Sequence, residues 1–546
     1  MDATTRRVSA AAVEALPRAG ADRVARHRAD GSWDDRTLAD GIEAAAGRRP
    51  DTVALIDGDG RLAWAGLAAA VAQGLASLRG HGVGPGDGVV LVSGNTRHGV
   101  IAYHALLRLG TTVAVLDRRC GPADVQVALD ALPGRPRVIV AADEAGRLGD
   151  VLAGAETLPL ELFGGEPGPA APPTWDEPDR DRTAVILFSS GTTGRPKGVA
   201  HSLNTLTAGA SNMARITSAD ESTVAFLISP LTSITGLMQV HLAADQHATL
   251  ALEDRFEPAG TLQRMAAAGA TLLGGAPVIA ERLLRAAAGP DGAGSDGAGS
   301  GSAETRGGVT LRTLALGGAM LPRPLLELAT DSFGIEIARV YGSSEAPNFS
   351  GSLATDDRER RLSDDGALMP GGEVRIGSAE HPTEGLLRGP SMFLGYLDPA
   401  DDQSAFEDGW YRTGDQIEAH QGRLTVVGRL KELVNRNGLK VSLTEIDAAL
   451  AALPGVVEYA SFGMPDPETG ERLAVAVLAD EGVTITLDDV IRYLLAGGLA
   501  KRKLPEQLVR WDGPLPRTAS GKVVRSRLVM EAPAKDGDLA PRLRQT

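Results

Sequence analysis

Residues 186–199 read ILFSSGTTGRPKGV. An apolar run, which we expect to be a buried strand, leads into a loop of glycines and hydroxyl residues and then to a lysine. Glycines let backbone N–H groups approach phosphate oxygens, hydroxyls donate further hydrogen bonds, and the lysine adds positive charge. The stretch therefore predicts a phosphate site, with a Gly-rich surface turn as the alternative. The predicted donors are Ser189, Ser190, Gly191, Thr192, Thr193, Gly194 and Lys197.

The loop does not match the usual NTPase pattern. That pattern requires Gly-Lys followed directly by Ser or Thr, whereas Gly198 follows Lys197 here. A different class of phosphate loop is indicated.

Strand-like and helix-like segments alternate around this loop. GVVLVSG (88–94), RVIVAAD (137–143), TAVILFSS (183–190) and STVAFLIS (222–229) resemble buried strands, since they lack polar alternation. Between them lie Ala/Leu-rich stretches of helical period at 67–78, 99–110 and 277–288. The alternation predicts an α/β fold whose sheets are mainly parallel and flanked by helices.

Composition divides the chain into two domains. Residues 1–430 form the expected N-terminal domain, in which the low-complexity stretch 289–308 predicts a flexible surface insertion and the Gly/Pro-rich stretch 164–181 a loop. Residues 431–546 carry more charge and shorter elements, including EYASFGMPD (458–466) and RLAVAVLAD (472–480). They predict a small α+β C-terminal domain.

The overall composition excludes several protein classes. The chain has 546 residues and a formal net charge of −15, with no Lys/Arg run, so we expect no nucleic-acid partner. A single cysteine, Cys120, rules out an intramolecular disulfide and a Cys-rich metal site. No apolar stretch reaches the roughly 18 residues of a membrane span, and no export signal is evident, so a cytoplasmic protein is predicted.

The word SSGTTGRPKG resembles the signature of the adenylate-forming superfamily, which includes acyl-CoA synthetases, stand-alone adenylation domains and luciferase-like enzymes. Six further motifs follow in the family's order, and the resemblance runs from about residue 35 to 530. It implies a large ATP- and acyl-binding domain and a small mobile lid domain that carries a catalytic lysine.

Two of these motifs are expected to line the nucleotide. GGAMLP (317–322) resembles the segment beside the adenine and acyl pocket. YGSSE (341–345) is similar to the family's Tyr-Gly-x-Thr-Glu, which implies a tyrosine packed on adenine, a hydroxyl on the α-phosphate and a glutamate that binds Mg²⁺. The residues concerned are Gly317, Gly318, Ala319, Tyr341, Gly342, Ser344 and Glu345.

The next two motifs resemble the ribose site and the hinge. GWYRTGD (409–415) implies that Asp415 accepts hydrogen bonds from the ribose hydroxyls. VVGRLKE (426–432) implies that Arg429 also reaches the ribose. Lys431 falls at the position about which the family's small domain pivots.

The last two motifs belong to the small domain. NRNGLKVS (435–442) resembles the segment that forms the pantetheine passage, with Asn437 in place of a glycine and Gly438 after it. Asparagine best tolerates a left-handed backbone among non-glycine residues, so the turn can survive. LPRTASGKVVR (515–525) resembles the catalytic-lysine loop and makes Lys522 the candidate.

The substrate acid is expected to be neutral apart from its carboxylate. SPLTSITGLM (229–238) aligns with the acyl-pocket segment, and Ser233 stands where the family often has histidine. No Asp that could pair with a substrate ammonium is found there. The predicted pocket residues are Ser233, Ile234, Thr235, Gly236 and Gly342, and an apolar, alicyclic or aromatic acid is expected.

The implied ligands are ATP, Mg²⁺ and a thiol, either coenzyme A or the phosphopantetheine of a separate acyl carrier protein. Two other classes stay open: a luciferase-like oxygenase and a non-catalytic ATP-binding relative. The latter should lack the lysine or the acid, yet Lys522 and Glu345 are both present. A monomer or homodimer is expected.

Overall fold

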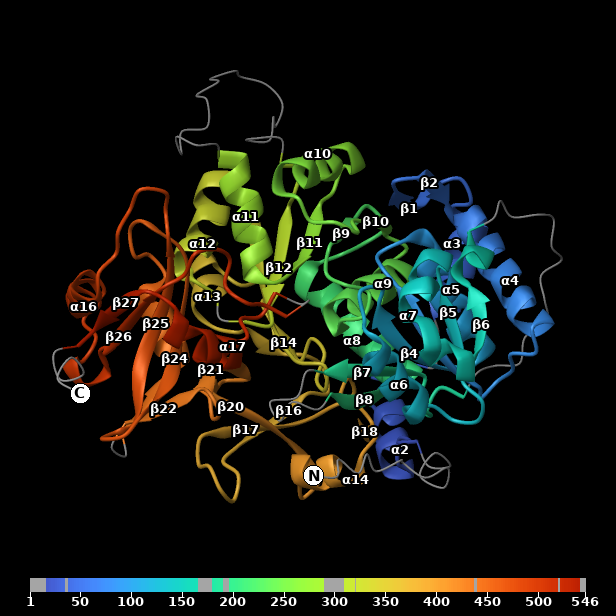
Figure 1. Cartoon of the computed structure of the whole chain (residues 1–546). Coiled ribbons are helices and arrows are strands. Elements are labelled where there is room, and N and C mark those ends of the chain that lie inside the picture. The colour runs from blue at the N-terminus through green and yellow to red at the C-terminus, as the bar shows by residue number, and fades with distance from the viewer. Residues whose placement is uncertain are drawn as a thin grey trace.

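The computed structural model describes residues 16–34, 38–164, 179–189, 196–288, 309–319, 321–436, 439–518 and 521–540. The predicted insertion at 289–308 lies outside these ranges, as does most of the stretch 164–181. Within them the strands form three sheets, two in a large N-terminal domain and one in a small C-terminal domain (Figure 1).

The first sheet holds the strand that leads to the phosphate loop. Its order is β18-β8-β7-β4-β3-β5-β6, and the segment from β7 to β6 is parallel. Every residue of β3 is buried, which explains the continuous apolar run at this point of the sequence. The bounds are β3 (Gly88–Ser93), β4 (Thr112–Asp117), β5 (Arg137–Val140), β6 (Glu156–Pro159), β7 (Val185–Ser189), β8 (Lys197–His201) and β18 (Gly395–Tyr396).

The second sheet has a parallel core in the order β10-β9-β11-β12-β13, with β1 parallel to β10 at its edge. An antiparallel hairpin joins β1 to β2. The bounds are β1 (Val53–Asp57), β2 (Gly60–Ala63), β9 (Val224–Leu227), β10 (Thr249–Leu252), β11 (Leu272–Gly275), β12 (Thr313–Gly317) and β13 (Glu336–Tyr341).

Helices cover both faces of these sheets. One hydrophobic core joins α4, α5, α8 and α9 to strands of both sheets, so these helices form the layer between them. A second core packs α6 and α7 on the outer face of the first sheet, and a third packs α10, α11 and α12 on the second. The bounds are α2 (Ala21–Ala29), α3 (Leu38–Arg48), α4 (Trp64–Gly80), α5 (Arg97–Leu109), α6 (Pro122–Ala131), α7 (Ala142–Leu148), α8 (Leu203–Thr217), α9 (Ile234–Gln246), α10 (Pro258–Ala268), α11 (Pro277–Ala288) and α12 (Arg323–Glu327).

The second sheet continues beyond β13 with antiparallel strands, which the strand–helix alternation did not predict. Gln421 and Gly422, with φ of 50° and 75°, form the two-residue turn between β20 and β21, and such turns match the twist of a hairpin. The bounds are β14 (Ser350–Gly351), α13 (Arg358–Ser363), β15 (Ala367–Leu368), β16 (Glu373–Ile376), β17 (Glu384–Arg388), α14 (Pro399–Ala405), β19 (Phe406–Glu407), β20 (Trp410–His420) and β21 (Arg423–Arg429).

The third sheet takes its strands from residues 433–539, in the order β23-β22-β25-β26-β27 with β24 paired to β25. The predicted strands at 458–466 and 472–480 are this β24–β25 pair. Helices α15 and α16 pack on one face and α17 on the other. The bounds are β22 (Leu433–Arg436), β23 (Leu439–Ser442), α15 (Leu443–Leu450), β24 (Val456–Asp466), β25 (Gly470–Ala479), α16 (Leu487–Ala496), β26 (Gln507–Arg510), α17 (Arg525–Glu531) and β27 (Gly537–Leu539).

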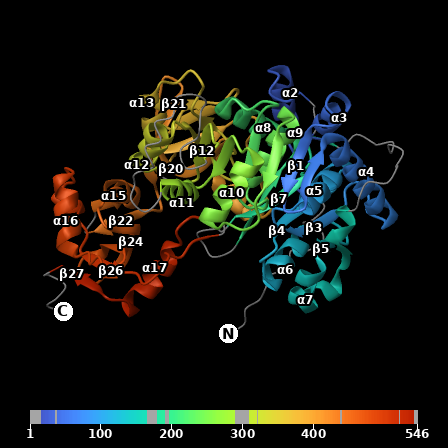
Figure 2. The same ribbon diagram turned by 90° about the horizontal axis from the view of Figure 1, so that it is seen from above.

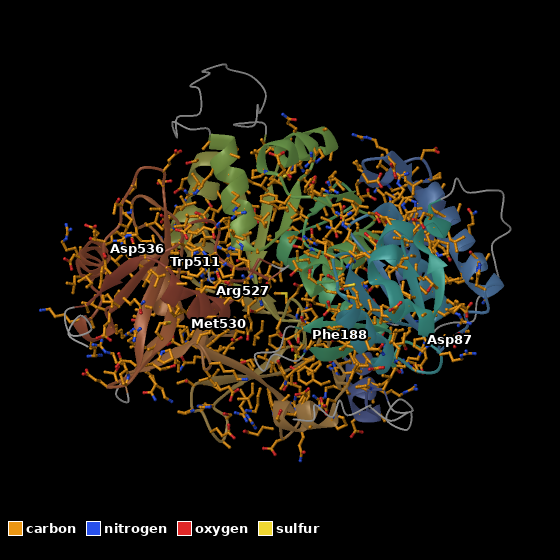
Figure 3. The ribbon with its side chains drawn as sticks, in the orientation of Figure 1. Asp87, Phe188, Trp511, Arg527, Met530 and Asp536 are labelled. Atoms are coloured by element: carbon orange, nitrogen blue, oxygen red, sulfur yellow. The ribbon has the colours of Figure 1, made fainter. Side chains whose placement is uncertain are left out.

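The small domain lies beside the part of the large domain that carries α11 and α12, as Figure 2 shows. Figure 3 labels Phe188, near the end of β7 in the large domain, and Arg527 and Met530 on α17 in the small domain. Among the described residues, no helix is both long and apolar enough to cross a membrane.

Candidate active site

The predicted phosphate loop connects two antiparallel strands. Ser189, the last residue of β7, is the direct partner of Lys197, the first residue of β8. In the NTPase loop, by contrast, a helix follows the lysine. Here the strand pairing places the backbone of the lysine at the end of the loop. The intervening Ser190, Gly191, Thr192, Thr193 and Gly194 lie outside the described residues, and their role as phosphate donors stays a prediction.

Lys197 has one partner on β18 and one on α14, the helix that follows it. Its ammonium lies 3.0 Å from Asp401 Oδ1 and 4.7 Å from the centre of the Tyr396 ring. Neither partner was predicted from the sequence, because both lie about two hundred residues further along the chain.

The GGAMLP segment begins where β12 ends. A Cβ on Gly317 would lie 2.2 Å from the carbonyl oxygen of Val340, so only glycine fits beside β13. Gly318 has a φ of 77°, a left-handed conformation that favours glycine. A Cβ there would meet Cε of Lys522 at 3.7 Å. Ala319 is exposed next to it. The small domain's predicted lysine thus reaches the end of β12.

The predicted adenine and ribose residues are directly hydrogen-bonded to one another. Tyr341, at the end of β13, donates from Oη to Asp415 Oδ2 at 3.0 Å. Arg429 Nε lies 2.9 Å from the other carboxylate oxygen of Asp415, and the two residues are partners on β20 and β21. Asp415 is only 6% exposed; burial raises its pKa, while Arg429 and Tyr341 oppose that shift. Each carboxylate oxygen keeps a lone pair with which to accept a ribose hydroxyl.

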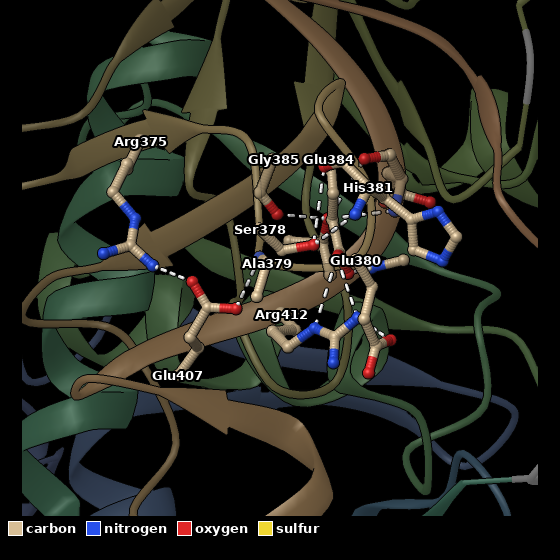
Figure 4. Close-up of polar contacts among 12 residues, drawn as sticks. Arg375, Ser378, Ala379, Glu380, His381, Glu384, Gly385, Glu407 and Arg412 are labelled. Atoms are coloured by element: carbon tan, nitrogen blue, oxygen red, sulfur yellow. Dashed lines mark hydrogen bonds and ion pairs between the residues drawn. The ribbon is translucent and has the colours of Figure 1, made fainter.

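A network of ion pairs fixes the turn before Asp415 (Figure 4). Glu384, which is 2% exposed, accepts from Arg412 and, through Oε1, from the backbone N–H of Gly414 at 3.1 Å. Thr413 Oγ1 donates to the carbonyl of Gly385 at 2.7 Å. Because these contacts connect β17 to β20, they hold the Asp415 carboxylate at a defined position.

Glu345, the predicted Mg²⁺ ligand, is held on its side chain and its backbone. Tyr396 Oη donates to Glu345 Oε1 at 2.8 Å, and the N–H of Phe393 donates to the Glu345 carbonyl at 2.8 Å. His201 Nε2 lies 2.7 Å from the carbonyl oxygen of Ser344 and therefore donates to it. Burial lowers the pKa of His201 to about 4, which keeps its imidazole neutral. His201 and Tyr396 are positioning residues that the sequence motifs did not reveal.

Lys522 sits on a closed hairpin of the small domain. The N–H of Thr518 donates to the Lys522 carbonyl at 2.8 Å, and the N–H of Val524 donates to the Pro516 carbonyl at 2.8 Å. Gly521, with a φ of 85°, faces the large domain, where a Cβ would lie 3.3 Å from Cβ of Ala276. The hairpin therefore packs directly against the start of α11.

The charges around Lys522 come from the large domain and the hinge. Burial lowers the pKa of this lysine, and so does the positive charge of Arg429, whereas Asp415, Glu345 and Glu432 raise it. The structure thus brings Lys522, Asp415, Arg429 and Glu345 into one electrostatic neighbourhood, although they are separated by up to 177 positions in the sequence.

The predicted acyl-pocket segment forms the start of α9. Ser233 is its N-cap: Oγ accepts from the N–H of Gly236 at 3.0 Å and donates to the Pro230 carbonyl at 2.7 Å. A Cβ on Gly236 would lie 2.1 Å from that same carbonyl oxygen. Ile234 and Thr235 occupy the first turn of the helix. Gly342 is likewise tightly packed, since a Cβ there would lie 2.6 Å from the Ala346 carbonyl oxygen.

The predicted hinge lies between β21 and β22. Lys431 is exposed in the turn that joins them. Next to it, Glu432 accepts from Arg525 Nη1 at 3.0 Å, and Arg525 also contacts Asp447 at 2.6 Å. The hinge is thereby linked to α17, the helix that follows the Lys522 hairpin. Asn437 and Gly438 lie outside the described residues.

A resident metal cage is not formed by the described residues, since no three His, Cys, Asp or Glu side chains cluster there. Glu345 nevertheless fits Mg²⁺, because this ion is typically held by one or two carboxylates together with substrate phosphates and water. Gly318 leaves open backbone beside Lys522, since a Cβ there would meet only Cε of that lysine, and open backbone suits a nucleotide.

Family comparison agrees with this arrangement. Residues 42–397 match the family described as AMP-binding enzyme, and residues 445–522 match the AMP-binding enzyme C-terminal domain. The chain belongs to the AMP-binding enzyme family. Both the predicted family and the predicted two-domain α/β fold are confirmed.

Relatives of this AMP-binding enzyme include ligases of aromatic acids. It is 30% identical to a salicylyl-CoA synthase / salicylate adenylyltransferase of Streptomyces sp, over 94% of this chain and 96% of the relative. It is 28% identical to a salicyl-AMP ligase / salicyl-S-ArCP synthetase of Mycobacterium tuberculosis, over 94% of this chain and 93% of that relative. The fold matches ATP-bound MatB from Rhodopseudomonas palustris with a TM-score of 0.78 and 24% identity, over 90% of this chain and 98% of MatB.

Proposed function

We propose that this enzyme activates a carboxylic acid with ATP, forming acyl-AMP and pyrophosphate, and then transfers the acyl group to the thiol of CoA. The observation that carries the proposal is the position of Lys522. Its Cε lies 3.7 Å from where a Cβ of Gly318 would be, at the end of a large-domain strand, and its pKa responds to Asp415 and Glu345. A lysine from the small domain thus completes a site built by the large one.

In the first step the acid's carboxylate attacks the α-phosphate of ATP. Both groups are anionic, so the barrier is mainly charge repulsion and positioning, and fixed donors lower it. Lys522 bridges the carboxylate and the α-phosphate, and Ser344 donates to the α-phosphate. No general base is required, because the nucleophile is already ionised.

The remaining residues hold the nucleotide. Tyr341 packs on adenine, Asp415 and Arg429 bind the ribose, and the loop donors with Lys197 bind the β- and γ-phosphates. The carboxylate of Glu345 holds Mg²⁺, which neutralises phosphate charge when bound.

In the second step the small domain rotates about Lys431. The rotation carries Lys522 away and brings the segment with Asn437 and Gly438 to the site, where it admits the pantetheine thiol. A hinge of this kind separates two half-reactions in one site. The closed hairpin around Lys522 supports the proposal, since it lets the lysine move as part of the domain.

The acid is a non-amino acid of apolar, alicyclic or aromatic type. Residues 229–238 carry no charge that could pair with an ammonium group. The Ser233 hydroxyl is committed to capping α9, so it does not replace a histidine as a polar group for the substrate. The salicylate ligases among the relatives support an aromatic acid.

A carrier protein is the alternative acceptor. One relative is named a salicyl-S-ArCP synthetase. Pyrophosphate release should therefore be measured across a panel of aromatic, alicyclic and medium-chain acids, with CoA, with an acyl carrier protein, and with neither. Thioester formation only with the carrier protein would replace CoA as acceptor, and no release with any acid would overturn the proposal.

Lys522→Ala tests the assignment within the site. We expect adenylation to fall by about 10²–10³-fold, as when one transition-state donor is removed. Thioester formation from supplied acyl-AMP should be spared. Lys501→Ala, at an exposed lysine of the same domain, is the matched control and should change neither step. Equal loss of both half-reactions in Lys522→Ala would contradict the assignment.

A further inference from the structure

Lys197, which the proposed function assigns to the pyrophosphate end of ATP, is ion-paired within the protein. Its ammonium lies 3.0 Å from Asp401 Oδ1, and the two side chains are only 23% and 19% exposed. The ring of Tyr396 covers another side of the ammonium at 4.7 Å. Solvent screens such a pair less than it screens a surface pair, so the interaction between the two charges is substantial.

The segment that carries Asp401 is fixed to the strand that carries Lys197. Tyr396 and Gly395 pair with Val199 and Ala200, and the N–H of Leu397 donates to the Gly198 carbonyl at 3.0 Å. A Cβ on Gly198 would lie 2.4 Å from Cδ1 of Leu397, which shows how closely the segments pack. The backbone that leads into α14 is therefore held beside the strand that carries Lys197.

The two neighbouring acids accept hydrogen bonds from backbone N–H groups of this segment. Asp398 caps α14 by accepting from the N–H of Ala400 at 2.9 Å. Asp402 accepts from the N–H of Tyr396 at 2.9 Å and so closes the turn. Asp401 instead turns its carboxylate to Lys197.

We propose that Asp401 is a positioning residue that competes with pyrophosphate for Lys197 and thereby speeds the release of that product. An incoming polyphosphate must displace the carboxylate from the ammonium and is repelled by its charge. When pyrophosphate leaves, Asp401 recovers Lys197. This inference rests on the proposed function in assigning Lys197 to the pyrophosphate.

Binding of magnesium pyrophosphate to the full-length protein, measured by titration calorimetry without acid or CoA, tests the inference directly. In Asp401→Asn the dissociation constant should fall by about fivefold or more, as expected when a close like charge is removed. Pyrophosphate should inhibit adenylation at correspondingly lower concentrations, and the KM for ATP should fall with it. If Asp401 had a purely structural role, its substitution would distort the segment beside β8 and pyrophosphate would bind more weakly.

Three variants keep the outcome unambiguous. Asp401→Ser, which also removes the charge, must shift binding in the same direction as Asp401→Asn, while Asp401→Glu, which keeps the charge, must stay near the unmodified protein. Asp408→Asn removes a carboxylate whose side chain is 85% exposed, from a left-handed residue that asparagine tolerates, and should leave binding unchanged.

Weaker or unchanged pyrophosphate binding in both neutral variants would overturn the inference, as would an unmodified protein that does not bind magnesium pyrophosphate. The proposed function fails separately, if no acid supports pyrophosphate release while the neutral variants still bind pyrophosphate more tightly.

Discussion

Arg282 and Glu458 join the two domains through one ion pair. Nη2 of Arg282, on α11 of the large domain, donates to Glu458 Oε1 at 2.5 Å. The other oxygen of Glu458 accepts from the N–H of Leu515 and from Arg517 Nη2, each at 3.1 Å. Glu458 is only 7% exposed. A single buried carboxylate thus connects α11 to the hairpin that presents Lys522.

Arg282→Ala should slow adenylation by about tenfold, or roughly 1.4 kcal/mol, because the closed arrangement loses a charged hydrogen bond. Thioester formation from supplied acyl-AMP should be unchanged, since the proposed rotation breaks this contact. The two half-reactions are measured separately by ATP–pyrophosphate exchange and by thioester yield.

Arg285→Ala is the matched control for Arg282→Ala. Arg285 lies on the same helix, is 56% exposed and pairs with Glu281 four residues away, so its loss should change neither half-reaction. Loss of both half-reactions in Arg282→Ala would show that the ion pair stabilises the fold in general rather than the closed state.

Tyr396→Phe should raise the Mg²⁺ concentration that gives half-maximal adenylation by about tenfold, because residues that orient a metal ligand commonly affect metal affinity by 10–100-fold. The substitution removes the hydrogen bond to Glu345 and keeps the ring beside Lys197. A magnesium titration at saturating ATP measures the effect. Tyr493→Phe, on α16, should leave the titration curve in place, and an unshifted curve for Tyr396→Phe would contradict a role in orienting Glu345.

We predict that three buried histidines make the folded protein less stable in mild acid. Burial lowers the pKa of His104 and of His201 to about 4, and that of His241 well below its ordinary 6.5. Each folded-state pKa lies below the unfolded value, so the unfolded chain takes up protons first. The stabilisation is complete above pH 6.5 and is lost as the pH falls towards 4.

For His104 this loss amounts to about 3 kcal/mol, at about 1.4 kcal/mol per pKa unit. The midpoint of thermal unfolding should therefore fall steeply between pH 6.5 and 4.5. His104→Leu should flatten that dependence, because it removes a titrating group. The substitution breaks no hydrogen bond of Nδ1, which is buried without a partner. The same slope in both proteins would rule out His104 as a contributor.

Sequence motifs located the proposed site residues that lie in short continuous words. Tyr341, Asp415, Arg429 and Lys522 each stand in such a word, and the structure brings them together. The apolar runs also identified β3, β5 and β7 of the first sheet and β9 of the second, because buried parallel strands are continuous apolar runs.

Contacts between residues far apart in the chain could not be predicted from the sequence. Tyr396 contacts Glu345 and Lys197 from β18, Asp401 contacts Lys197 from α14, and His201 contacts the Ser344 carbonyl from β8. No local spacing in the sequence indicates such contacts. The capping role of Ser233 did carry a local signal, since a hydroxyl residue directly before a helix is a preferred N-cap. The alignment of Ser233 with a family histidine predicted a residue of the acyl pocket instead.

The position of the Lys522 hairpin determines how much positive charge surrounds the proposed phosphate site. The large domain contributes Lys197 and Arg429, and the small domain adds a further positive charge only while its hairpin rests against Gly318. The electrostatic potential of the site would therefore depend on the angle between the two domains in the proposed rotation. In the proposed rotation, each opening would remove one unit of positive charge from the site. In a protein of net charge −15, the rotation would therefore control how strongly the site attracts phosphate-bearing ligands.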